Sequence, residues 1–86
     1  MEHDLKTWPD VFAHVWSNHK QFEARKDDRG FRLGDTLVLR EFDPAAGTYS
    51  GLVVRAVVSY ILRGGSFGIE PGHVVMSIVQ VGRSER

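Results

Sequence analysis

Apolar residues near the N-terminus recur at the spacing i, i+3, i+4, i+7 and i+8, which places them on one face of an α-helix. They are Trp8, Val11, Phe12, Val15 and Trp16. The preceding residues are typical of a helix start, because Thr7 can cap the first turn, Pro9 suits that turn, and Asp10 favours the positive end of the helix dipole. We therefore expect one short helix that ends near Asn18, with both tryptophans anchored in the core.

Outside this helix the pattern changes to an alternation with a period of two, which is typical of β-strands. It predicts strands at residues 3–6, 21–26, 36–42, 49–62 and 73–81. The even positions of residues 52–62 are all apolar and predict one buried face. The last strand is apolar on both faces in its middle, which predicts a central place in the sheet. Residues 43–47 and 63–72 have the composition of loops.

These elements predict a single α+β domain over residues 1–86. A short chain buries its strands best by curling the sheet, so we expect a small β-barrel of about five strands. The N-terminal helix would close one end or side of this barrel. Phe31 and Leu33 are expected in the core, and residues 81–86 are expected to fray as a tail.

The composition narrows the possible chemistry. With 86 residues and no cysteine, the chain can form neither disulfides nor a thiolate zinc site. Its four histidines lack the spacing of metal ligands, and His14 and His19, five residues apart, fall on different faces of a helix. We therefore expect no metal and no cofactor.

The charged residues are balanced overall but unevenly distributed. Eleven Lys and Arg residues match eleven Asp and Glu residues, which argues against a chain-wide basic surface for nucleic acid. Counted in segments, residues 1–19 carry a net charge of −2, residues 20–32 of +2, residues 33–54 of −2 and residues 55–86 of +2. The positive charge is mostly arginine, whose planar fork suits phosphates and carboxylates. A small cationic cleft is therefore compatible with the neutral total.

The sequence predicts neither a targeting segment nor a membrane span. The first ten residues contain four charges, which leaves no room for the apolar core of a signal peptide. The most apolar stretch, residues 52–62, is about half as long as a membrane-spanning helix and contains Arg55. We therefore expect a cytoplasmic protein without a membrane partner.

The segment most suggestive of a binding site follows the expected helix. Glu23 and Arg25 alternate onto the same face of a strand, where they offer one acceptor and one fork of donors to a polar ligand. Lys20 has the opposite parity in a regular strand, but it lies at the helix-to-strand junction, where the backbone need not alternate. A plain surface ion pair explains the same three residues.

The spacing Lys-x-x-Glu-x-Arg at Lys20, Glu23 and Arg25, just after a short helix, resembles the signature of the ASCH superfamily. That signature usually begins Gly-x-Lys, and here Asn18 takes the glycine position, a minor change because both residues suit a helix end. The resemblance continues at residues 31–35, 37–41, 47–51, 60–62, 67–68 and 74–76 and covers roughly residues 3–80. Within ASCH, the chain resembles a bacterial and phage family of small uncharacterised domains.

The resemblance implies a PUA-like β-barrel that binds RNA or a nucleotide in a cleft beside the helix. It also implies that Lys20, Glu23 and Arg25 line this cleft, together with Lys6 and Arg40. Lys20 and Arg25 would contact phosphate, whereas Glu23 would accept a hydrogen bond from a base amino group.

Two other functions stay open. One ASCH branch that this segment resembles hydrolyses acetylated cytidine and needs a lysine, a threonine three residues later and a distant glutamate. Here Lys20 matches the lysine, but Glu23 stands at the threonine position and cannot replace a hydroxyl nucleophile, so an enzyme is the less favoured hypothesis. A protein-interaction module that uses a sheet edge also fits the zero net charge.

A second candidate segment is the sequence Arg-Gly-Gly-Ser-Phe-Gly at residues 63–68. Its glycines would let the backbone approach a phosphate, but it lacks the Lys-Ser/Thr ending of a P-loop. An ordinary flexible connection is the favoured interpretation. Phe67 in this loop either plugs the core or stacks on a base.

Overall fold

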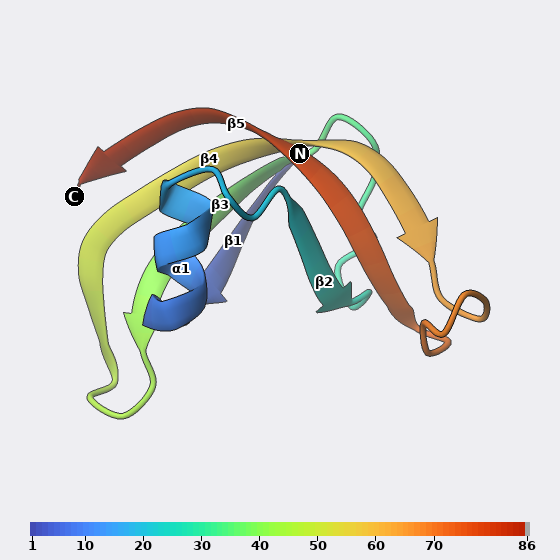
Figure 1. The fold of residues 1–86 in the computed structure, drawn as a ribbon, viewed down its shortest axis with the longest axis horizontal. Coiled ribbons are helices and arrows are strands. Elements are labelled where there is room, and N and C mark those ends of the chain that lie inside the picture. The colour runs from blue at the N-terminus through green and yellow to red at the C-terminus, as the bar shows by residue number, and fades with distance from the viewer. Residues whose placement is uncertain (86) are drawn as a thin grey trace.

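The computed structural model describes residues 1–85, which form one helix and five strands (Figure 1). In chain order these are β1 (Glu2–Thr7), α1 (Pro9–Trp16), β2 (Phe22–Lys26), β3 (Thr36–Asp43), β4 (Thr48–Arg63) and β5 (His73–Glu85). The strands form one sheet in the order β1-β3-β4-β5-β2. β1 is parallel to β3, and the other neighbouring pairs are antiparallel. The small α+β domain expected from the sequence is therefore present.

The sheet is curled into a half-barrel and does not close into the expected barrel (Figure 1). Within residues 1–85 no backbone ladder joins β1 to β2, so both strands are edges of the sheet. A side chain links these edges instead, because the Arg25 guanidinium on β2 donates to Lys6 O on β1 at 2.9 Å. α1 lies on the concave side of the curl and packs against β3.

The helix forms where the sequence predicts it but starts differently. Thr7 does not cap it, because this residue completes β1 and pairs with β3, and Trp8 takes the N-cap position without a side-chain hydrogen bond. The extended backbone of Trp8 removes its side chain from the helical stripe, so it is 59% exposed, contrary to the prediction. Phe12 and Val15 are buried, and Trp16 packs against the core.

No helix in residues 1–85 has the length and apolar character that crossing a membrane requires.

The core lies on the concave face of the sheet. It consists of Leu5, Phe12, Val15, Phe31, Leu37, Leu39, Val54, Ala56, Val58, Val74, Met76 and Ile78. The alternation expected along β4 holds as far as Val58 and then breaks, because the register shifts between Val58 and Tyr60. This bulge leaves Tyr60 exposed and brings Ile61 against the core instead.

The C-terminal segment extends β5 rather than fraying. Residues 82–85 pair with residues 52–55 of β4. Arg83 donates to Trp16 O at 3.3 Å, and its guanidinium carbon lies 5.1 Å from the centre of the Trp16 ring. The expected tail is therefore wrong for residues 81–85, and residue 86 lies outside the described residues. The central place predicted for this strand is confirmed only for residues 73–77, which lie between β4 and β2, whereas its later residues pair with β4 alone.

The glycine-rich loop between β4 and β5 is held by its own backbone. The Gly64 N–H donates to His73 O at 2.7 Å, and the Gly65 N–H donates to another loop carbonyl at 2.8 Å. These two amides are therefore not free to cradle a phosphate. Phe67 is 83% exposed, so it does not plug the core. A Cβ on Gly64 would lie 1.8 Å from Glu70 O, which explains why the loop needs glycine at this position.

We expect Gly64→Ala to lower the free energy of unfolding by about 1–3 kcal/mol, because the loop backbone must move to make room for the methyl group. Gly82→Ala is the matched control, since a Cβ at Gly82 meets nothing within 4 Å. Urea denaturation followed by circular dichroism measures both variants. Equal stabilities would contradict this account of the loop.

A buried carboxylate holds the turn that leads into β3. Asp35 Oδ2 lies 2.8 Å from His3 Nε2 and accepts the Arg32 N–H at 3.0 Å, and Oδ1 lies 3.3 Å from the N-terminal ammonium group. The bond with His3 is the main contact that lowers the pKa of Asp35 below its ordinary value of 3.8, although burial acts in the opposite direction. Phe31 packs edge-on against the His3 ring and is buried as predicted. Leu33 was expected in the core but is exposed, because it lies within this turn.

The lowered pKa predicts a loss of stability in acid. As the pH falls, Asp35 takes up a proton in the unfolded chain before it does so in the folded protein. The free energy that ionised Asp35 contributes to folding is therefore complete above the ordinary pKa of 3.8. It is lost as the pH falls through the lower pKa of the folded state. Asp35→Asn should therefore lower the free energy of unfolding at pH 7 by about 2 kcal/mol and flatten its decline below pH 4, roughly the ordinary pKa.

Urea denaturation at a series of pH values measures this effect. Asp28→Asn is the control, because Asp28 is exposed and its nearest cation, Arg29, is 4.0 Å away. An acid decline in Asp35→Asn as steep as that of the unmodified protein would exclude Asp35 as its source.

Candidate functional site

Two adjoining cavities meet where the edge strands β1 and β2 approach one another. The large cavity has a volume of about 1000 Å³ and the small cavity a volume of about 430 Å³. Lys6 and Arg25 line both, so we call the two cavities together the groove. The other residues of the large cavity are Asp4, Leu5, Arg29, Arg40, Tyr49, Ser50, Gly51, Leu52 and Val53. The other residues of the small cavity are Thr7, Trp8, Val11, Lys20, Phe22, Glu23 and Ala24.

Glu23 is a buried carboxylate with a cation on each oxygen. Only 3% of this residue is exposed. Its Oε1 accepts a hydrogen bond from Lys20 Nζ at 2.7 Å, and its Oε2 accepts one from Arg25 Nε at 2.9 Å. Such pairing is what makes the burial of a carboxylate tolerable. The prediction that Glu23 and Arg25 share one face of their strand is confirmed, while Phe22 and Ala24 are exposed on the other face.

Lys20 reaches Glu23 because of the way the chain leaves α1. Asn18 has a φ of 64°, which is the left-handed conformation that asparagine tolerates better than most residues. The chain then turns back so that the Lys20 backbone N–H donates to His14 O at 3.0 Å. This turn precedes the regular alternation of β2, so Lys20 can lie beside Glu23. Lys20 Nζ also donates to Phe22 O and lies 4.7 Å from the centre of the Phe22 ring.

Arg25 connects the buried carboxylate to the opposite edge of the sheet. Its Nε binds Glu23 on β2, and its Nη2 donates to Lys6 O on β1 at 2.9 Å. The Arg25 side chain is nevertheless 27% exposed, which leaves part of the guanidinium open to the groove. One side chain thus serves both the fold and the walls of the two cavities.

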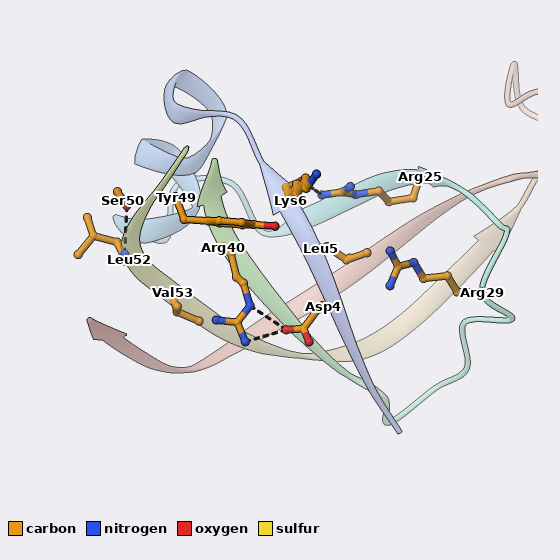
Figure 2. A pocket seen from close by; sticks show the side chains of 11 residues that line it. Asp4, Leu5, Lys6, Arg25, Arg29, Arg40, Tyr49, Ser50, Leu52 and Val53 are labelled. Carbon is orange, nitrogen blue, oxygen red and sulfur yellow. Dashed lines mark hydrogen bonds and ion pairs between the residues drawn. The ribbon is translucent and has the colours of Figure 1, made fainter. Parts of the chain in front are cut away.

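Figure 2 shows Arg40 and Asp4 facing one another in the wall of the large cavity. Arg40 Nε and Nη2 each lie 2.8 Å from Asp4 Oδ1, across the parallel pair of β1 and β3. Lys6 Nζ lies 4.4 Å from the centre of the Phe42 ring, which packs edge-on against Tyr49 at 4.9 Å. The Tyr49 ring extends along the cavity and is about half exposed (Figure 2).

The large cavity gathers positive charge in a chain whose formal net charge is zero. A single carboxylate, Asp4, faces four cationic side chains, Lys6, Arg25, Arg29 and Arg40. Arg29 forms one ion pair among the described residues, and it is long: its Nε lies 4.0 Å from Asp28 Oδ1. The cavity therefore has the electrostatic character of an anion-binding site.

All five residues singled out from the sequence lie along the groove. Lys20 and Glu23 belong to the small cavity, Arg40 to the large one, and Lys6 and Arg25 to both.

Thr7, Arg29 and Tyr49 are among the groove residues that sequence reasoning missed. Thr7 had the pattern of a helix cap, Arg29 that of a turn residue, and Tyr49 that of a strand start. No local signal distinguishes them, because only the curl of the sheet brings these distant segments together.

The structure also corrects one expectation about the histidines. His14 and His19 are five residues apart, yet the turn at Asn18 brings their ring centres to 6.2 Å. The part of the chain that the structure describes contains no group of three or more side chains able to hold a metal ion. The two histidines alone supply fewer ligands than a structural or catalytic zinc site uses.

Sequence comparison places the chain in a family. No curated protein matches it. One family model, described as a domain of unknown function (DUF3850), matches residues 2–78 and thus includes all five of the predicted site residues. Because this match spans most of the chain, the protein belongs to the DUF3850 family of domains of unknown function.

Proposed function

We propose that this domain binds RNA or a nucleotide in the groove, chiefly through phosphate groups. The observation that carries the proposal is the concentration of cations around the large cavity of a neutral chain. A local positive field of this kind attracts phosphate and does not need the broad basic surface of unspecific nucleic-acid binders.

Three of these cations have donors to offer a phosphate. Arg40 uses Nε and Nη2 on Asp4, while its Nη1 makes no hydrogen bond within residues 1–85. Arg29 is held only by its long contact with Asp28, and Lys6 Nζ lies on an aromatic ring rather than on a carboxylate. A phosphate entering the large cavity therefore meets charged donors without first breaking a buried ion pair.

An aromatic surface lies beside these donors. The exposed ring of Tyr49 can stack on a base, and stacking combined with phosphate contacts is a common way of holding single-stranded RNA. Both oxygens of Glu23 are already bonded, so we assign it to positioning Lys20 and Arg25 rather than to reading a base.

The resemblance to ASCH supports the same function. Its signature residues Lys20, Glu23 and Arg25 lie together in one wall of the groove. A curled five-stranded sheet with one helix on its concave side is also compatible with a PUA-like domain. The resemblance to ASCH implies an RNA or nucleotide site in a domain of this type.

We expect Arg40→Ala to weaken the binding of a short single-stranded RNA or a nucleoside monophosphate about tenfold at low salt, because a charged donor is lost. Arg55→Ala is the matched control. Arg55 also pairs with a carboxylate of β1, that of Glu2 at 3.1 Å, but it lines neither cavity. Fluorescence anisotropy measures RNA binding and calorimetry measures nucleotide binding. The proposal is wrong if the unmodified protein shows no saturable binding or if both variants bind equally.

One contact favours hydrolysis of a modified nucleoside as a second candidate. Lys20 and Glu23 are directly hydrogen-bonded in the wall of a cavity, which is the proximity that general acid–base catalysis requires of its side chains. A substrate would have to displace one of the two cations from Glu23, since both carboxylate oxygens are occupied.

Incubation with acetylated nucleosides, followed by chromatography, tests this candidate. If the protein is such a hydrolase, the unmodified protein forms deacetylated product and Glu23→Gln does not. Glu70→Gln, at an exposed carboxylate outside both cavities, is the control. Absence of turnover, or turnover retained in Glu23→Gln, excludes the proposed role of Glu23.

A further inference from the structure

The hydroxyl group at the end of β1 is buried and has no partner. Thr7 is 3% exposed, and its Oγ1 makes no hydrogen bond within residues 1–85. A buried hydroxyl in this state costs free energy relative to a methyl group of the same shape. The helix start does not explain it, because Trp8 takes the N-cap position and no side chain caps the helix. Valine at this position would serve the fold at least as well.

Thr7 lines the small cavity, and its neighbours there are unusual for a protein surface. Trp8 is 59% exposed and Phe22 is 48% exposed, so two large aromatic side chains of the cavity are not committed to the core. Lys20 and Glu23 form a charged and already neutralised wall. The small cavity thus combines aromatic surface, one ion pair and one hydroxyl group without a partner.

This combination suits a flat heteroaromatic ring. The volume of about 430 Å³ is that of a small-ligand site. Aromatic side chains stack on the faces of nucleobases, and a hydroxyl can either donate to the edge of a base or accept from it. Lys6 and Arg25 line both cavities, so a base in the small cavity would leave its phosphate within reach of these two cations.

We propose that the small cavity is a nucleobase site in which the Thr7 hydroxyl hydrogen-bonds to the edge of the base. This inference rests on the proposed nucleotide or RNA function and assigns a different part of the ligand to each cavity. The large cavity holds phosphate, and Tyr49 remains available to a neighbouring base of an RNA. Thr7 Oγ1 is screened from solvent, so binding of the base requires a neighbouring side chain of the small cavity to move.

The test compares probes with and without a base. The four ribonucleoside 5′-monophosphates are titrated by calorimetry beside ribose 5-phosphate, which presents the same sugar and phosphate without a base. In Thr7→Val we expect the affinity for the best-bound nucleotide to fall about fivefold through loss of one hydrogen bond, while the affinity for ribose 5-phosphate stays within about twofold. The melting temperature should stay the same or rise, because a methyl group replaces an unpaired hydroxyl.

Two variants complete the design. Thr7→Ser keeps the hydroxyl and should retain the nucleotide affinity. Thr36→Val changes a threonine of β3, the strand next to β1, that lines neither cavity, and should leave both affinities unchanged.

Each outcome decides between the two proposals. Nucleotide binding that Thr7→Val leaves unchanged overturns the base site but not the phosphate groove. Failure of every probe to bind the unmodified protein overturns the proposed nucleotide function and this inference with it. A lowered melting temperature in Thr7→Val means that the hydroxyl serves the fold and also counts against the inference. If that variant does not fold, the Thr7 methyl signal in the unmodified protein must shift with the nucleotide and not with ribose 5-phosphate.

Discussion

The pairing of one buried carboxylate with two cations is the constraint on which the groove depends. Glu23 can be buried because Lys20 and Arg25 each occupy one of its oxygens. Arg25 then extends to the carbonyl of Lys6, so the same contact holds the two open edges of the sheet near each other. A side-chain link of this kind leaves a cavity on either side of it. A continuous backbone ladder between β1 and β2 would fill that space.

The positive field of the groove is a product of folding rather than of composition. Lys6, Arg25, Arg29 and Arg40 come from three separate stretches of a chain with zero formal charge, because Arg25 and Arg29 are close in sequence. The parallel pairing of β1 with β3 and the curl of the sheet bring them to one side. Several acidic residues meanwhile pair outside the groove: Asp27 pairs with Arg63 at the end of β4, Asp35 with His3, and Glu2 with Arg55. A neutral protein can in this way present a locally cationic surface.

Several expectations failed at points where local rules compete with sheet pairing. Thr7 has the chemistry of a helix cap, but its backbone is committed to the ladder with β3. Tyr60 continues the apolar alternation of its strand, but a bulge just before it reverses the direction of the side chains. Residues 82–85 are polar and close to the chain end, yet they pair with β4 because that strand is long enough to receive them. In each case a partner that is distant in sequence decides the outcome.

The sequence by itself determined the elements and the local chemistry: one short helix, the strands and their alternation, and the cluster of Lys20, Glu23 and Arg25. These features depend on residues a few positions apart: the helix and the strands follow from periodicity, and Lys20 joins Glu23 and Arg25 through the local turn at Asn18. Only the tertiary structure decided that the barrel stays half open, that Tyr49 joins the arginines, and that the Thr7 hydroxyl is buried without a partner. These features depend on contacts between distant segments, and the local pattern of a single sequence does not encode such contacts.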